Sequence, residues 1–154
     1  MNPFRFPVQL RWSDMDPNFH LRHSVFYDLG AQARVEALRS VGITSQRMQV
    51  NDFGPILFRE ECVFRREIRL GEKVDILFHM SKARPDGSRF SFRHEFVRED
   101  GTVCALLTVD GAWIDTKLRK LTVPPLELMT RFLGLPRTED FEFLPPSDGS
   151  AAKA

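Results

Sequence analysis

Residues 11–30 read RWSDMDPNFHLRHSVFYDLG, and the interpretation of the whole chain starts from this stretch. Apolar and polar residues alternate from Phe4 to Trp12, at the start of this stretch and just before it, which predicts a strand. Turn-forming residues from Ser13 to His23 then predict a loop with two carboxylates, and Ser24 suits the N-cap of a helix. A carboxylate is therefore expected beside the free backbone N–H groups of a helix start, an arrangement suited to acyl-group hydrolysis.

The segment that follows predicts one long helix with a wide apolar face. Its apolar residues recur at helical spacing and several of them are small: Phe26, Leu29, Gly30, Ala33, Ala37, Leu38 and Val41. Gly42 suits the C-cap position. Because small residues allow a neighbouring layer to approach closely, we expect a sheet to wrap around this helix.

Beyond Gly54 the pattern has a period of two residues and predicts a run of antiparallel strands. Strands are predicted at Ile56–Arg69 and Val103–Asp115. Between them lie two more strands, one with the apolar face Val74, Ile76, Phe78 and Met80, and one along which Phe90, Phe92, His94 and Phe96 line up. The strand Val103–Asp115 is the most continuously apolar and is therefore expected at the centre of the sheet. A turn at Pro85-Asp86-Gly87 predicts a hairpin. The order β-α-β-β-β-β indicates an α+β fold, with a short helix at Leu126–Leu133 and a flexible tail at 145–154.

Size and composition indicate one ordinary domain. The chain has 154 residues and a net charge of +1, so we expect a single domain over residues 1–144 with no affinity for nucleic acid or an anionic membrane. No stretch approaches the ~18 apolar residues of a membrane span. Cys62 and Cys104 lack metal-ligand spacing and are interpreted as buried reduced thiols, with a disulfide as the alternative. These features predict a cytoplasmic protein.

The chain resembles the hotdog-fold acyl-CoA thioesterases, in particular 4-hydroxybenzoyl-CoA thioesterase and the YbgC and FadM proteins. The resemblance is carried by Arg11-Trp12-Ser13-Asp14-Met15-Asp16-Pro17, His20, Phe26-Tyr27-Asp28, Arg34, Phe53-Gly54-Pro55-Ile56 and Leu70-Gly71. The family pattern is D-x-D followed by G-H-V-N-N, and the similarity covers about residues 4–124. It implies a long central helix wrapped by a curved five-stranded antiparallel sheet.

The resemblance also implies how the site is built. The catalytic carboxylate falls at Asp16, and the oxyanion donor is the backbone N–H of His23. Two protomers are expected to meet as a homodimer, or to assemble further as a homotetramer, with the active site at a subunit interface. The family's G-H-V-N-N run reads Phe19-His20-Leu21-Arg22-His23 here, so the glycine and both asparagines are replaced. This departure bears on the substrate scope and on the loop conformation.

The residues of this loop leave chemical alternatives open. Asp16 would act either as a general base for water or as a nucleophile that forms a mixed anhydride, and the structural alternative is an ordinary Asp-Pro turn. Asp14 is expected to bond loop amides. His20 either positions the thioester or the loop, or simply bonds a backbone carbonyl. We predict no metal and no bound cofactor, although these carboxylates and imidazoles, with His23, are of the ligand types that suit zinc or iron.

Two further groups of residues are candidates for binding or for the core. The predicted hairpin carries three cations that suit the phosphates of coenzyme A, with a solvated hairpin as the alternative: Lys82, Arg84 and Arg89. A weaker form of the same signal comes from Arg65, Arg66 and Arg69. His94 lies among phenylalanines and is interpreted as a core histidine with satisfied hydrogen bonds.

The sequence therefore predicts an acyl-CoA thioesterase that acts on a fatty or aromatic acyl-CoA. Two alternatives remain open. One is a module that binds acyl-CoA or an acylated carrier protein without turnover, and the other is a hotdog dehydratase or hydratase. Release of free thiol from a panel of CoA thioesters separates the first possibility from the other two.

Overall fold

The computed structural model describes residues 2–147. Its elements are β1 (Phe4–Pro7), the 3₁₀ turn η1 (Trp12–Asp14), α1 (His23–Ser40), α2 (Ser45–Val50), β2 (Phe53–Phe64), β3 (Val74–Ala83), β4 (Arg89–Arg98), β5 (Val103–Asp115), β6 (Lys120–Leu121), α3 (Leu126–Phe132) and β7 (Arg137–Phe143). The predicted order of one strand, one long helix and four strands is confirmed. The elements α2, β6 and β7 are additions. Most of the tail expected at 145–154 lies outside the described residues.

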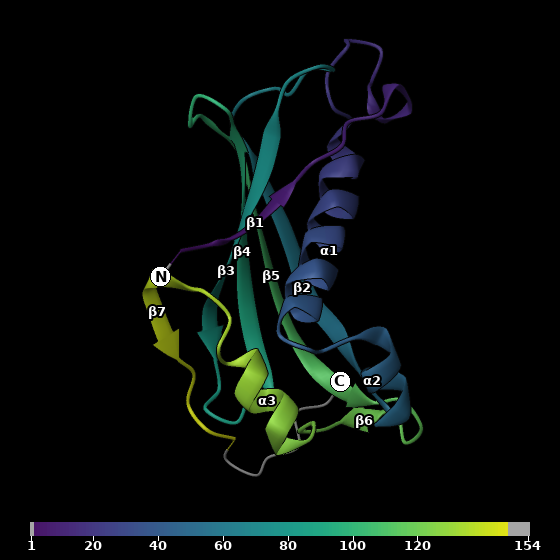
Figure 1. Ribbon diagram of the computed structural model, residues 1–154, viewed down its shortest axis with the longest axis vertical. Helices are drawn as coiled ribbons and strands as arrows, with labels where there is room; N and C mark the ends of the chain where they lie inside the picture. The colour runs from purple at the N-terminus through teal and green to yellow at the C-terminus, as the bar shows by residue number, and fades with distance from the viewer. Residues whose placement is uncertain (1, 148–154) are drawn as a thin grey trace.

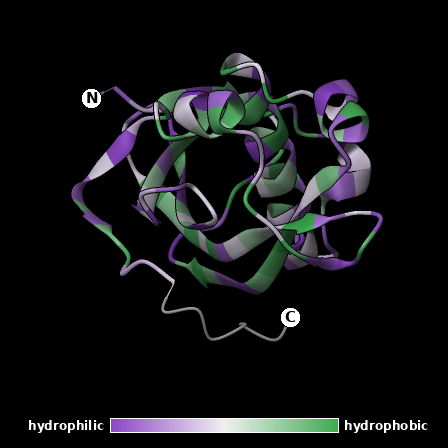
Figure 2. Cartoon of the chain, turned by 90° about the horizontal axis from the view of Figure 1, so that it is seen from below, coloured by the Kyte–Doolittle hydropathy of each residue, from purple (hydrophilic) through white to green (hydrophobic). Residues whose placement is uncertain are grey.

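The strands form one sheet in the order β1-β3-β4-β5-β2, and α1 lies along its concave face (Figure 1). β6 pairs with β5, whereas β7 runs parallel to β3 at the end of that strand away from β1. Seen from below, the sheet curls around the helical layer, and hydrophilic and hydrophobic residues alternate along its strands (Figure 2). The predicted fold class is therefore confirmed, with two short strands added to the five expected.

The small residues of α1 set the distance between the helix and the sheet. A Cβ atom at Gly30 would lie 2.2 Å from the Leu107 Cδ2 atom of β5, so a larger residue fits only if that side chain moves. Ala33 and Ala37 are fully buried on the same helix. The helix therefore packs closely against β5 through small side chains. β5 was expected at the centre of the sheet; it lies inside the sheet, paired with both β4 and β2, whereas β4 is the middle strand.

Two predicted strand boundaries are wrong, for different reasons. The first strand ends at Pro7 rather than Trp12, because its partner β3 begins at Val74, whose carbonyl accepts the last bond of the ladder from the Val8 N–H. The second strand spans Phe53–Phe64 rather than Ile56–Arg69. The backbone N–H groups of Arg65 and Arg66 both donate to the Cys104 carbonyl, at 2.8 and 2.9 Å, and this bulge ends the regular ladder.

The predicted N-cap of the long helix is also wrong. The helix begins at His23, and Arg22, with extended backbone, takes the N-cap position without a side-chain capping bond. Ser24 lies inside the first turn, where its hydroxyl accepts a hydrogen bond from Arg22 Nε at 3.0 Å. No helix in the described part of the chain is long and apolar enough to cross a membrane.

Candidate active site

The loop between β1 and α1 is fastened by Asp14, whose side chain is almost fully buried. The Arg11 guanidinium contacts its carboxylate at 2.7 Å, and the Arg11 backbone N–H donates to the same group at 3.1 Å. This hydrogen bonding by the Arg11 side chain holds the pKa of Asp14 below its ordinary value, although burial acts in the opposite direction. The Arg22 N–H closes the loop on the Asp14 carbonyl at 2.8 Å. Asp14 therefore has the structural role that was predicted.

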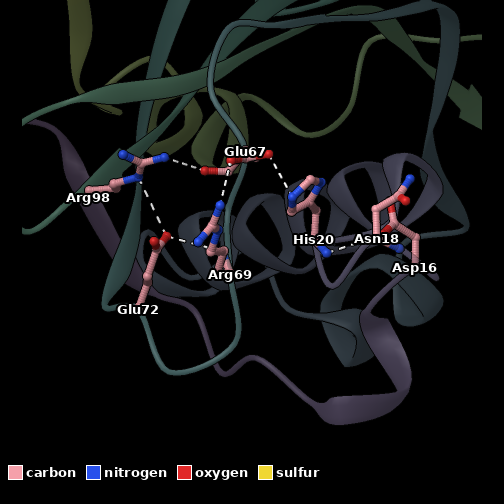
Figure 3. Close-up of polar contacts among 7 residues, drawn as sticks. All are labelled: Asp16, Asn18, His20, Glu67, Arg69, Glu72 and Arg98. Atoms are coloured by element: carbon pink, nitrogen blue, oxygen red, sulfur yellow. Dashed lines mark hydrogen bonds and ion pairs between the residues drawn. The ribbon is translucent and has the colours of Figure 1, made fainter.

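Asp16 lies in a tight turn and its carboxylate is held by that turn. Its Oδ1 atom accepts hydrogen bonds from the backbone N–H groups of Asn18 at 2.8 Å and His20 at 3.1 Å (Figure 3). Its own backbone N–H donates to the His20 carbonyl at 2.7 Å. No partner is found for the Oδ2 atom among residues 2–147. The carboxylate is thus oriented through one oxygen, and the other is left for a substrate or a water molecule.

The same turn forces a phenylalanine into an unusual backbone conformation. Phe19 has a φ of +65° and an 80% exposed side chain. The left-handed region costs a residue with a side chain about 1–2 kcal/mol and is the natural place for glycine. Phe19 stands where the resembled pattern has its glycine, and its backbone conformation is one that suits glycine better than phenylalanine.

His20 is paired with a residue that the sequence did not reveal. Its Nε2 atom lies 2.6 Å from a carboxylate oxygen of Glu67, in the connection between β2 and β3 (Figure 3). The other oxygen of Glu67 lies 3.1 Å from Arg69, and the Leu21 N–H donates to the Ile68 carbonyl at 2.7 Å. These contacts hold the Asp16 loop against the connection between β2 and β3. Of the alternatives open for His20, positioning of the loop fits this geometry.

The start of α1 presents two backbone donors beside this loop. The N–H groups of His23 and Ser24 have no acceptor within the described residues, whereas those of Arg22 and Val25 are bonded to Asp14 and Arg22 carbonyls. Unpaired N–H groups at the positive end of a helix stabilise a developing oxyanion. The segment from Asp16 to Ser24 therefore carries a half-free carboxylate, the histidine of the His20–Glu67 pair and two free backbone donors.

The three hairpin cations do not join this group within one protomer. The β3–β4 hairpin lies at the end of the sheet opposite the Asp16 loop (Figure 1), and β3 alone is about 30 Å long. Lys82 is paired with Glu142 at 2.9 Å, and the Arg89 guanidinium stacks over the Phe58 ring at 4.6 Å. The hairpin can serve the same site only when it comes from a second copy of the chain.

Neither the two cysteines nor a metal-binding cluster adds a reactive group in the described part of the chain. Both cysteines are free; Cys104 is buried, whereas Cys62 is only half-buried, which corrects the expectation for that residue. Burial raises the pKa of Cys62 to about 11, with a contribution from Glu60, and burial also raises the pKa of Cys104, so neither is a thiolate at neutral pH. Residues 2–147 contain no group of three or more His, Cys, Asp or Glu side chains that could hold a metal ion.

His94 is a core histidine, as predicted. It is fully buried, and its Nδ1 atom lies 3.0 Å from the Leu107 carbonyl. Its Nε2 atom lies 3.4 Å from a guanidinium nitrogen of Arg34, which in turn contacts Glu60 at 3.4 Å. Since a guanidinium only donates, the ring is neutral, with its proton on Nδ1.

Comparison with known proteins gives one family and many similar structures. The sequence profile of the thioesterase-like superfamily matches residues 10–132. No curated protein matches the sequence. A hypothetical protein from Staphylococcus aureus, solved in complex with CoA, superposes with a TM-score of 0.81 at 15% identity, over 100% of this chain and 96% of that one.

Two further structures carry thioesterase names. A 1,4-dihydroxy-2-naphthoyl-CoA thioesterase from Synechocystis has a TM-score of 0.75 at 19% identity, over 86% of this chain and 96% of that one. The probable thioesterase YbaW from Escherichia coli has a TM-score of 0.72 at 18% identity, over 84% and 96% of the two chains. At these identities the likeness establishes the fold.

Proposed function

The chain belongs to the thioesterase-like superfamily and has its hotdog fold, and we propose that it is an acyl-CoA thioesterase for a fatty or aromatic acyl-CoA. The observation that carries this proposal is the pair of unpaired N–H groups at His23 and Ser24, next to the loop that orients Asp16. A thioester carbonyl on those donors would face the free oxygen of the carboxylate. The catalytic assignment comprises Asp16, the backbone of His23, and His20 as a positioning residue.

Two routes to hydrolysis are compatible with this site. As a general base, Asp16 takes a proton from water, the hydroxide attacks the carbonyl carbon, and the C–S bond breaks to release the thiol. As a nucleophile, a carboxylate oxygen attacks the carbon directly, the thiolate leaves, and water hydrolyses the acyl-aspartyl anhydride. In either route the helix donors stabilise the oxyanion, and one such donor typically contributes about 3 kcal/mol to the transition state.

The proposal is tested by incubating the purified protein with a panel of CoA thioesters, short and long aliphatic as well as aromatic, and following free thiol. We expect hydrolysis of at least one member. Tight binding of acyl-CoA with no thiol release across the panel would favour the non-catalytic module instead. Addition of water to an enoyl-CoA, without thiol release, would favour the hydratase.

We also propose a homodimer formed through β2. This strand pairs only with β5 among the described residues, so its other edge is open. Its exposed apolar side chains, 41–48% accessible, are Leu57, Phe58, Val63 and Phe64. An open edge with apolar side chains favours pairing with a second copy about a two-fold axis. Such pairing would turn the partner's hairpin toward this protomer's Asp16 loop.

Val63→Lys is expected to shift the protein from dimer to monomer, because it places a charge within the apolar part of this edge. Sedimentation velocity at micromolar concentration measures the change. The matched control is Leu126→Lys, on α3, where the side chain is 82% exposed and the dimer should persist. A wild-type monomer, or a Val63→Lys variant that remains a dimer, contradicts this assembly.

A further inference from the structure

Two adjacent arginines leave the sheet at the bulge that ends β2. Arg65 and Arg66 both donate their backbone N–H to the Cys104 carbonyl, so two residues of this strand face one residue of β5. A bulge interrupts the alternation that would send neighbouring side chains to opposite faces, and bulges commonly re-aim side chains next to active sites. Both arginines are exposed. Neither has an acidic partner within ion-pair distance in the described part of the chain.

The acids near this pair are already engaged by other groups. Glu67 contacts His20 at 2.6 Å and Arg69 at 3.1 Å. Glu72 lies 3.5 Å from Arg98, and the same arginine also donates to the Glu67 carbonyl (Figure 3). The positive charge of the Arg65–Arg66 pair is therefore not compensated locally, and an anion would meet two forked donors side by side.

The pair is also close to the candidate active site. Glu67, which holds His20, follows Arg66 directly in the chain. Two residues of extended chain span about 7 Å, so both arginines leave the backbone within about that distance of the residue that holds His20. The hairpin cations of the same protomer, in contrast, lie at the opposite end of the sheet (Figure 1), and only those of a partner could approach this loop.

We propose that Arg65 and Arg66 form the phosphate-binding site for the nucleotide end of the acyl-CoA, an inference that rests on the proposed function. Guanidinium groups bind phosphate through paired hydrogen bonds, and the nucleotide of coenzyme A carries a 3′-phosphate and a diphosphate. The arginines hold the nucleotide at the rim while the acyl thioester reaches the helix start. They favour an acyl-CoA over a thioester that lacks the nucleotide, such as an acyl-pantetheine. They take no part in breaking the C–S bond.

The test combines a binding assay and a kinetic assay on Arg65→Ala/Arg66→Ala. Titration calorimetry with adenosine 3′,5′-bisphosphate, which lacks a thioester, should show affinity at least tenfold weaker than wild type. The KM for an acyl-CoA should rise at least tenfold with kcat within twofold, whereas the KM for the matching acyl-pantetheine should stay unchanged. Arg65→Lys/Arg66→Lys should recover part of the affinity, because the charge is kept and the fork is lost.

Arg39→Ala/Arg131→Ala is the matched control, because it removes the same charge from exposed arginines on α1 and α3. In this control the affinity for the bisphosphate and the KM for the acyl-CoA should equal those of the wild type. Equal binding of the bisphosphate by wild type and Arg65→Ala/Arg66→Ala overturns the assignment, as does an equal rise in KM for both substrates or an effect found only in Lys82→Ala/Arg84→Ala. If no thioester is cleaved, the proposed function fails, yet the bisphosphate titration still decides this site.

Discussion

Asp16→Asn is expected to lower kcat for the cleaved thioester by about 10³-fold, while the free energy of unfolding stays within about 0.5 kcal/mol of wild type. Asparagine keeps a side-chain oxygen that can accept from the N–H groups of Asn18 and His20, so the turn is retained. It carries no charge and can neither take a proton from water nor attack a carbonyl. The rate change corresponds to about 4 kcal/mol in the transition state.

Two companion variants separate chemistry from loop structure. Asp16→Ala should lose the same activity and also about 1 kcal/mol of stability, because the two N–H groups lose their acceptor. Asp14→Asn should lower the stability but keep the activity, since it removes the charge that holds Arg11 and leaves Asp16 in place. Steady-state kinetics and urea unfolding on the same preparations measure both effects. Activity retained in Asp16→Asn would remove this carboxylate from the mechanism.

The general arrangement of the fold could be predicted because its signals are local. The small apolar face of α1 requires a close layer, and Gly30 against Leu107 is that contact. A period of two residues predicted the run of strands, and both ends of β5, Val103 and Asp115, were predicted correctly. The candidate loop was found in the same way, because turn-forming residues between a strand and a helix mark it.

The misplaced boundaries come from interactions that one segment makes with another. Ser24 has the right chemistry for a cap, but the Arg22 N–H is bonded to the Asp14 carbonyl, which fixes the chain and starts the helix two residues earlier than a cap at Ser24 would. Likewise, residues 65–69 continue the alternation of a strand. The bulge at the Cys104 carbonyl ends that strand, and a bulge has no signal in the sequence.

Glu67 could not be predicted for the same kind of reason. It belongs to the connection after β2, far from His20 in the chain, and reaches it only because the two segments are bonded through Leu21 and Ile68. An acid between arginines reads as a solvated surface residue. A pairing that depends on the folded arrangement of two loops can be found only in the structure.

The stability of the protein is expected to fall as the pH drops below 6.5, and His94 is expected to be a main cause. Burial, and secondly the nearby Arg34 guanidinium, lower the pKa of His94 to about 3, whereas an unfolded histidine titrates near 6.5. Between these two pH values His94 is protonated in the unfolded chain and neutral in the folded chain. The stabilisation is therefore complete above pH 6.5 and is lost progressively toward pH 3, at about 1.4 kcal/mol per pH unit.

Between pH 7 and pH 5 this amounts to about 2 kcal/mol, and the window isolates histidine from the acids. Asp14, with a lowered pKa, contributes only below its ordinary value of 3.8. Urea unfolding at both pH values should show the loss in wild type and a much smaller one in His94→Gln. His79→Gln is the matched control, because burial also lowers the pKa of that half-buried residue, to a lesser extent.

An NMR titration of the His94 ring gives a readout that does not depend on how well a variant folds. The ring packs edge-on against Phe78 and is bonded on both sides, to Leu107 and Arg34, so a proton on Nε2 would face a guanidinium in a dry core. Its resonances should stay in the neutral position down to pH 4 in the folded protein. Protonation near pH 6, or an unchanged pH slope in His94→Gln, would show that another group causes the loss of stability at low pH.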